Sequence, residues 1–265
     1  IDQDGRPGGE KLVREKTRQA VEKALHRMKS KRIDVMQFHA WHYANPVWLD
    51  CLFALEEIRK EGLIGEVGLT NFDTTHLRMA VRSGIKISSN QICYSLLDQR
   101  AAGEMTAFCL AEDIGIYAFG TIAGGLLSEK WLNTPEPDSE TLSNWSLMKY
   151  KRFTDQCGGW KKFQELLNAL HKISLETGIT ISHLASAYIL ERPAVKGVIV
   201  GARLGESSHL ESNKNLSAVE LSPKVKSEIK NALELLNPIP GDCGDEYRKP
   251  PYLTASGDLS HHVST

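Results

Sequence analysis

The sequence lacks the features that mark a membrane-spanning, secreted or nucleic-acid-binding protein. No apolar run approaches the ~20 residues that cross a bilayer, and the opening IDQDGRPGGEK is polar and glycine-rich, without an apolar leader. The 265 residues carry a formal net charge of −1, so no basic field favours nucleic acid or an anionic membrane. We therefore expect neither nucleic acid nor a membrane as a partner.

Cysteine pairs are also missing. The five cysteines are scattered and odd in number, and none forms a CxxC pair, which argues against a disulfide scaffold and a zinc site. Free, mostly buried thiols in a reducing compartment fit this pattern, so we expect a cytoplasmic protein. Organelle targeting stays open, because the sequence has no initiator Met and its true N-terminus could lie upstream. His42 follows His39 at a spacing that suits a metal, but no third ligand stands nearby, and we expect no metal.

Strand and helix patterns alternate along most of the chain, separated by short glycine turns. Apolar strands are expected to start near Ile33, Ile64, Lys86, Ile114 and Lys196. Helical patterns are found at 12–28, 50–60, 73–84, 101–113, 181–193 and 222–236. This alternation is typical of parallel βα units, whose strands are covered on both faces. We therefore expect an α/β fold.

Two stretches depart from the alternation. Residues 131–160 are rich in Asn, Pro, Ser and Asp, and they predict a long insertion over one face. Residues 237–265 are rich in Pro and Gly with little periodicity, which predicts an irregular C-terminal arm. Residues 1–236 are then expected to form one domain.

The expected strand ends gather polar and aromatic residues. Sites in parallel barrels lie at the carboxyl ends of the strands, so these positions are the ones to compare. In chain order the five ends deliver His39; Thr70 and Asn71; Asn90 and Gln91; Phe119 and Gly120; and Gly201, Ala202 and Arg203. An imidazole, several amides, an aromatic ring and a guanidinium would thus line one rim.

These strand ends belong to longer motifs that resemble one family. HAW after an apolar strand, EVGLTNF, SSNQICYSLLD, YAFGTIAGGLLSEKW and VIVGARLGESSHLESN occur in the order found in the aldo-keto reductases, and the resemblance covers about residues 12–235. It implies a (β/α)8 TIM barrel that uses NADP(H) without a Rossmann domain, and GxGxxG is indeed absent. Because five of eight βα units are found, we expect an incomplete barrel whose N-terminal units lie outside this sequence.

The resemblance implies that residues at the first strand ends contact the substrate and the nicotinamide. His39 matches the histidine that orients and polarises the substrate carbonyl. Thr70, Asn71 and Gln91 match the side chains that hold the nicotinamide carboxamide, since an amide can both donate and accept hydrogen bonds. Phe119 matches the ring that stacks on the nicotinamide, where Tyr or Trp is usual.

The remaining matches concern the rest of the dinucleotide. The loop that carries the pyrophosphate corresponds to Gly120, Ile122, Gly124 and Leu126, and a lysine near the phosphates in some members corresponds to Lys130. The adenosine side corresponds to Gly201, Arg203, His209 and Asn213. Arg203 fits the 2′-phosphate, because a guanidinium pairs bidentately with phosphate. His209 and Asn213 fit the adenine end.

The catalytic tyrosine, aspartate and lysine of the family have no counterpart at a matching position. We therefore expect the intact protein to reduce an aldehyde or ketone to an alcohol with NADPH, and this chain alone to be inactive or nearly so. The alternative is a non-catalytic, cofactor-binding regulatory or scaffold protein, because the resemblance extends to potassium-channel β subunits. Structural roles also stay open: a core position for His39 or Phe119, ordinary turn and strand amides for Asn71 and Gln91, and a surface position for Arg203.

Overall fold

Five parallel strands form one sheet in the described part of the chain. A computed structural model describes residues 10–138, 142, 145–202 and 209–249. The strands pair in sequence order and are β1 (Ile33–His39), β2 (Ile64–Thr70), β3 (Ile87–Cys93), β4 (Gly115–Phe119) and β5 (Val195–Ile199). β1 and β5 are the two edges, so the sheet formed by these residues does not close into a barrel.

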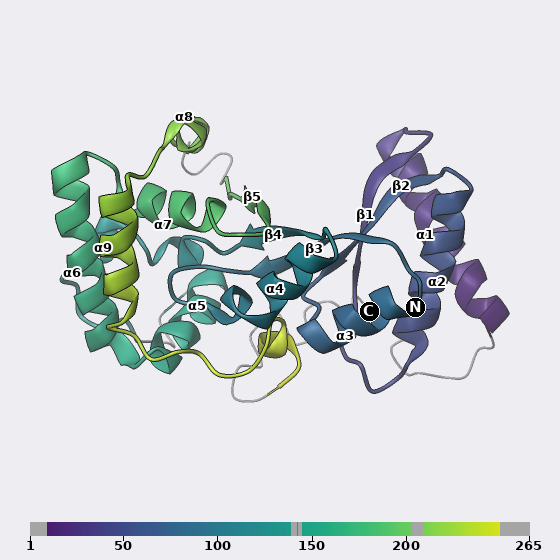
Figure 1. The fold of residues 1–265 in the computed structure, drawn as a ribbon, viewed down its shortest axis with the longest axis horizontal. Helices are drawn as coiled ribbons and strands as arrows, with labels where there is room; N and C mark the ends of the chain where they lie inside the picture. Colours follow the sequence, from purple (N-terminus) through teal and green to yellow (C-terminus); the bar gives the residue numbers. More distant parts are fainter. Residues whose placement is uncertain (1–9, 139–141, 143–144, 203–208, 250–265) are drawn as a thin grey trace.

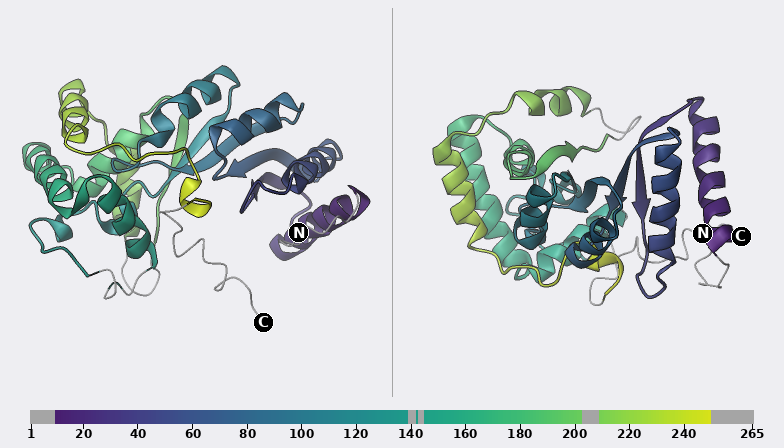
Figure 2. Two further views of the ribbon diagram at one scale, coloured as in Figure 1. Left: turned by 90° about the horizontal axis from the view of Figure 1, so that it is seen from below. Right: turned by 45° about the vertical axis from the view of Figure 1, so that its right-hand side comes forward.

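Helices pack around this sheet (Figure 1). They are α1 (Glu10–Met28), α2 (Val47–Lys60), α3 (Thr74–Arg82), α4 (Glu104–Ala111), α5 (Trp145–Gln156), α6 (Gly159–Thr177), α7 (Ile181–Leu190), α8 (Leu210–Asn215) and α9 (Pro223–Leu233). Figures 1 and 2 show α1 and α2 beside β1 and β2 at one end of the molecule, and α6 and α9 together at the other. Within the described ranges, no helix is both long and apolar enough to cross a membrane.

Helix starts follow local capping chemistry. Asp73 is the N-cap of α3, and its side chain accepts a hydrogen bond from the backbone N–H of His76 at 2.7 Å. Thr180 and Ser222 cap α7 and α9 in the same way. Because such caps satisfy backbone N–H groups that have no partner inside the helix, these starts are fixed by the local sequence.

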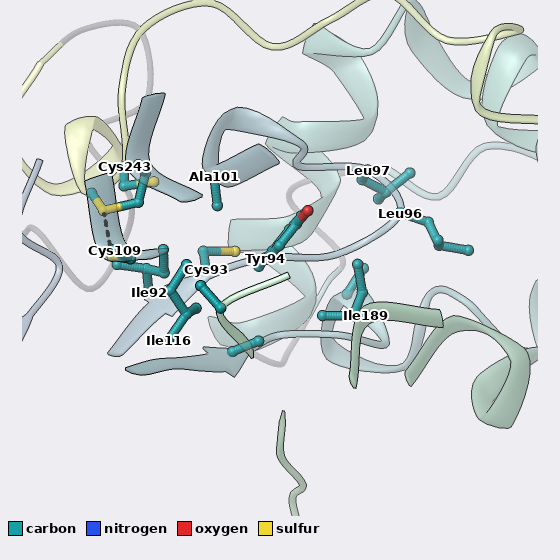
Figure 3. Close-up of a cluster of buried hydrophobic side chains, with 14 of the residues drawn as sticks. Ile92, Cys93, Tyr94, Leu96, Leu97, Ala101, Cys109, Ile116, Ile189 and Cys243 are labelled. Atoms are coloured by element: carbon teal, nitrogen blue, oxygen red, sulfur yellow. Dashed lines mark hydrogen bonds between the residues drawn. The ribbon is translucent and has the colours of Figure 1, made fainter. Parts of the chain in front are cut away.

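The core lies between the sheet and the helices. Ile92 and Ile116 from β3 and β4 are fully buried, and Figure 3 shows them beside Cys93, in a cluster that also includes Ile189 of α7. The same cluster includes Cys243, from the part of the chain that follows α9. All five cysteines are free and buried, which confirms the prediction of unpaired, buried thiols.

The predicted alternation of strands and helices is confirmed, with three corrections. α6 and the short α8 were not among the predicted helices. β3 continues to Cys93, two residues beyond the expected end near Gln91. The insertion at 131–160 is not irregular throughout, because α5 lies within it and buries Tyr150 and Phe153 on one side. Apolar residues three or four apart are typical of a helix face, so this signal was present in the sequence.

Candidate functional site

Three of the predicted site residues form one row across neighbouring strands. His39 is paired with Thr70, and Thr70 is paired with Gln91. Residues in register on parallel strands point to the same face of the sheet, and each of these three side chains is half-buried. Phe119 ends the next strand, paired with Cys93. The strand ends therefore gather at one rim, as the sequence predicted.

Two buried polar atoms at this rim lack hydrogen-bond partners. They are Nε2 of His39 and Oδ1 of Asn71, which follows β2 directly. Asn71 is 5% exposed, and its φ of 55° lies in the left-handed region. Buried polar atoms in proteins are nearly always paired, so these two atoms mark a place where a ligand that donates or accepts hydrogen bonds would be stabilised.

The imidazole of His39 is uncharged near neutral pH. Burial, followed by the positive charges of Arg248 and Lys149, lowers the pKa of His39 to about 4. A neutral imidazole has one N–H donor and one acceptor nitrogen. At pH 7 it can therefore donate a hydrogen bond to a carbonyl oxygen without carrying a charge.

Aromatic rings surround this imidazole. The His39 ring meets Trp41 edge-on at 4.7 Å and Tyr247 edge-on at 5.7 Å between centroids, and all three side chains are half-buried. The Trp41 and Tyr247 rings are 6.4 Å apart. Aromatic groups at a partly open rim offer an apolar wall beside the polar atoms, which is the usual lining of a small-molecule site.

Lys149 of α5 contacts the aromatic residues of this rim. Its Nζ donates to the Tyr247 hydroxyl at 2.5 Å and stands 4.9 Å from the centroid of the Phe119 ring. Burial raises the pKa of Tyr247, and the Lys149 ammonium opposes that rise only in part. One face of Phe119, the ring expected to stack on a nicotinamide, is thus in contact with a buried ammonium.

α5 also covers the glycines of the loop after β4. Gly120 and Gly124 have φ of 71° and 64°. A Cβ at Gly120 would overlap the Tyr150 hydroxyl, and one at Gly124 would lie 2.8 Å from Oγ of Ser146. In this arrangement the space that the missing Cβ atoms leave is filled by α5. The residues predicted to hold the carboxamide of a nicotinamide cofactor therefore keep an unpartnered amide oxygen, that of Asn71, whereas the residues predicted to hold its ring and pyrophosphate are covered by α5.

The other predicted cofactor residues are spread over the loop after β4 and the turn after β5. In the loop after β4, Ile122 is half-buried, Leu126 is in the core, and the exposed Lys130 has its Nζ 5.6 Å from the Trp131 ring centroid. After β5, Nδ2 of Asn213 donates to the carbonyl of Gly201 at 3.1 Å, and His209 precedes α8. Arg203 lies outside the described residues. These roles therefore stay predictions.

Sequence reasoning missed the segment at 238–249, called here the C-terminal segment. It runs across the strand ends, and its short 3-10 helix (Asp245–Tyr247) is the yellow turn below the middle of the sheet in Figure 1. Arg248 donates to the backbone carbonyls of Ala40 and Asn71. Oδ2 of Asp242 accepts from the backbone N–H of Thr74 at 2.8 Å. The sequence of the C-terminal segment has no periodicity, so no local pattern predicted these contacts.

The docking of this segment depends on Gly244. Its φ is 81°, and a Cβ there would overlap the carbonyl oxygen of Asn71. We expect Gly244→Ala to lower the free energy of unfolding by about 1–2 kcal/mol for the left-handed backbone and by about 1–3 kcal/mol more for the overlap. Urea unfolding measures the total, and faster tryptic cleavage after Arg248 reports release of the segment.

Gly84→Ala is the matched control. Gly84 has a φ of 85° with no atom within 4 Å of the position that a Cβ would take. Gly84→Ala therefore measures the cost of the left-handed backbone without an overlap. Equal losses for the two variants, with unchanged tryptic cleavage, would show that Gly244 is not needed for close packing.

Comparisons with known proteins agree with this geometry. Residues 4–234 match the Aldo/keto reductase family. The chain is 27% identical over 214 residues to the uncharacterized oxidoreductase YqkF of Bacillus subtilis, covering 80% of this chain and 63% of the relative. It therefore spans less than two thirds of the length of that curated relative.

Solved structures show the same fold. The aldo-keto reductase AKR11C1 from Bacillus halodurans, in its holo form, superposes with a TM-score of 0.62 at 24% identity, over 83% of this chain and 67% of that one. The glycerol dehydrogenase AKR11B4 from Gluconobacter oxydans gives 0.70 at 18% identity, over 85% and 65%. The five-stranded sheet corresponds to part of their (β/α)8 barrels.

Proposed function

The chain belongs to the aldo/keto reductase family, and from this premise we propose that the whole protein reduces an aldehyde or ketone to an alcohol with NADP(H). The observation that carries the proposal is the pair of unpartnered atoms, Nε2 of His39 and Oδ1 of Asn71, at the carboxyl ends of adjacent strands. One suits a carbonyl oxygen and the other suits an amide N–H. A cytoplasmic location fits the five free cysteines.

The residues of the rim have distinct roles in this proposal. The cofactor, when bound, supplies a hydride. Thr70, Asn71 and Gln91 would hold its carboxamide, and His39 would orient the substrate by donating a hydrogen bond to the carbonyl oxygen. Such a bond strengthens as negative charge develops on the oxygen, so it stabilises the transition state more than the ground state.

The roles of Phe119, Gly120 and Gly124 require α5 to move. Lys149 now contacts the Phe119 ring, and Tyr150 fills the space beside Gly120. Ile122, Leu126, Lys130, Gly201, Arg203, His209 and Asn213 keep their proposed places along the pyrophosphate and adenosine. Titration of the full-length protein with NADPH and NADH, followed by fluorescence, tests the adenosine side, and equal affinities would overturn the role of Arg203.

We expect the 265-residue chain alone to reduce carbonyls at least about 10²-fold more slowly than the full-length gene product, because the family's proton donor has no counterpart at a matching position. The measurement is NADPH oxidation with 4-nitrobenzaldehyde at saturating cofactor. Equal rates would contradict the expectation. They would make Tyr247, whose ring contacts His39, the residue to replace next by Phe.

A non-catalytic role is the second candidate, and the lack of a counterpart to the family's catalytic tyrosine, aspartate and lysine at matching positions of this chain favours it. The two candidates differ in one measurement on the full-length protein. NADPH binding with turnover of carbonyl substrates supports the reductase. Binding without turnover over a panel of aldehydes and ketones supports a cofactor-binding regulatory protein.

A further inference from the structure

A single guanidinium joins the two chain segments that carry the unpartnered atoms. Nη1 of Arg248 donates to the carbonyl of Asn71 at 2.6 Å, and Nη2 donates to the carbonyl of Ala40, the residue after His39. Nη1 also donates to the carbonyl of Gly244 at 3.1 Å. The ends of β1 and β2 are thus connected to each other through a residue that lies 177 positions beyond Asn71.

Arg248 is itself held in place. Its guanidinium carbon lies 4.2 Å from the centroid of the Tyr43 ring, and that ring stacks on His76 at 3.5 Å. The hydroxyl of Tyr43 accepts from the backbone N–H of Asp73 at 3.3 Å. A guanidinium stacked on a fixed aromatic ring loses little freedom when it forms hydrogen bonds. Arg248 is therefore preorganised to receive the two carbonyls.

The C-terminal segment that carries Arg248 is anchored on both sides. Asp242 binds the backbone N–H and the hydroxyl of Thr74, at 2.8 and 3.2 Å, where α3 begins. Glu246 accepts from the guanidinium of Arg100 at 2.8 Å, and both side chains are almost fully buried. These contacts give Arg248 a defined position relative to β1 and β2.

We propose that Arg248 is a positioning residue of the carbonyl-reduction site, which fixes the separation of the His39 imidazole and the Asn71 carboxamide by holding the backbone carbonyls beside them. The inference rests on the proposed function, because that separation sets where the substrate carbonyl lies relative to the cofactor carboxamide. Asn71 has a left-handed φ of 55°, which a non-glycine residue keeps only when its surroundings hold it. Arg248 supplies that support.

The geometry requires an arginine. Two carbonyls that follow different strands need two N–H groups that diverge in one plane, and a guanidinium provides them, whereas a lysine ammonium is a single point of charge. Arg248→Lys therefore keeps the positive charge near His39 and loses the hydrogen bond to one of the two carbonyls. Arg248→Met loses the charge and both hydrogen bonds.

The test compares these two variants in the full chain with Arg59→Met as the control. Arg59 also forms a forked pair, with Glu56 at 2.7 and 2.8 Å, but on α2. NADPH binding is measured by fluorescence, and the His39 ring is titrated by NMR. We expect both Arg248 variants to bind NADPH about ten-fold more weakly. Arg248→Met should raise the pKa of His39, because it removes one of the two positive charges that lower it. Arg248→Lys keeps a positive charge at this position and Arg59→Met changes neither of the two, so both variants should leave the pKa of His39 unchanged.

The outcomes separate this inference from the proposed function. A folded Arg248→Met protein with the affinity and His39 titration of the parent would overturn it. If Arg248→Met does not fold, the test rests on Arg248→Lys. An Arg248→Lys protein that binds NADPH as tightly as the parent would then overturn the inference. If the parent binds no NADPH, the proposed function fails. In that case the NMR signals of the Asn71 amide groups are compared between Arg248→Lys and the parent. Identical signals would overturn the inference that Arg248 positions this rim.

Discussion

Replacing Arg100 by Met is expected to lower the free energy of unfolding by about 3–5 kcal/mol, because it leaves two buried carboxylates without their partner. The side chain of Arg100 is 2% exposed, and those of Asp98 and Glu246 are 0% exposed. Its guanidinium donates to Asp98 at 2.6 and 2.8 Å, to Glu246 at 2.8 Å and to the carbonyl of Asp242 at 2.8 Å. This cluster joins the connection between β3 and α4 to the C-terminal segment.

The loss should appear as a fall in Tm of roughly 10 °C in a protein of this size. Arg82→Met is the control, because Arg82 pairs with Glu112 at 2.9 Å but is 69% exposed, and an exposed ion pair contributes about 1 kcal/mol or less. Chemical denaturation of both variants gives the comparison. Similar losses for Arg82→Met and Arg100→Met would mean that the buried cluster does not anchor the C-terminal segment.

The sequence predicted what depends on short-range patterns. Short apolar runs between glycine turns placed the five strands, period-3.6 patterns placed most helices, and parallel βα geometry placed the strand ends on one rim. The choice between Asn90 and Gln91 also follows from alternation along a strand. Asn90 is fully buried and donates to the carbonyl of Phe72 at 2.9 Å, whereas Gln91 is half-buried in the row with His39 and Thr70.

Contacts between distant parts of the chain could not be predicted. Arg100 and Glu246 are 146 positions apart, and neither stands in a periodic pattern. The cover of α5 over Phe119 depends on where the insertion folds back, which no local motif encodes. The left-handed φ of Asn71 is likewise set by its surroundings rather than by its neighbours in sequence, since Asn also occurs in ordinary turns. The rim was thus predicted, and the groups that support it were not.

His39 is expected to make the protein less stable as the pH falls from about 6.5 to about 4. Burial, with Arg248 and Lys149, lowers the pKa of His39 from 6.5 to about 4 in the folded protein. Over this interval the unfolded chain binds a proton that the folded chain does not, so the free energy of unfolding decreases as the pH falls. The whole contribution is at most about 3 kcal/mol, and it does not change further below the folded pKa.

Urea unfolding of the parent and of His39→Gln at half-unit steps between pH 4 and pH 7.5 isolates this contribution, because the other titrating groups are common to both proteins. The free energy of unfolding of the parent minus that of His39→Gln should be constant above pH 6.5. Below pH 6.5 this difference should decrease, because only the parent loses the contribution of His39. His42→Gln, at an exposed position three residues away, is expected to keep the slope of the parent. A difference curve that is flat throughout would mean that His39 is protonated as easily in the folded protein as in the unfolded chain. The imidazole would then be partly charged at the rim near neutral pH, and the neutral hydrogen-bond donor on which carbonyl binding depends would be lost.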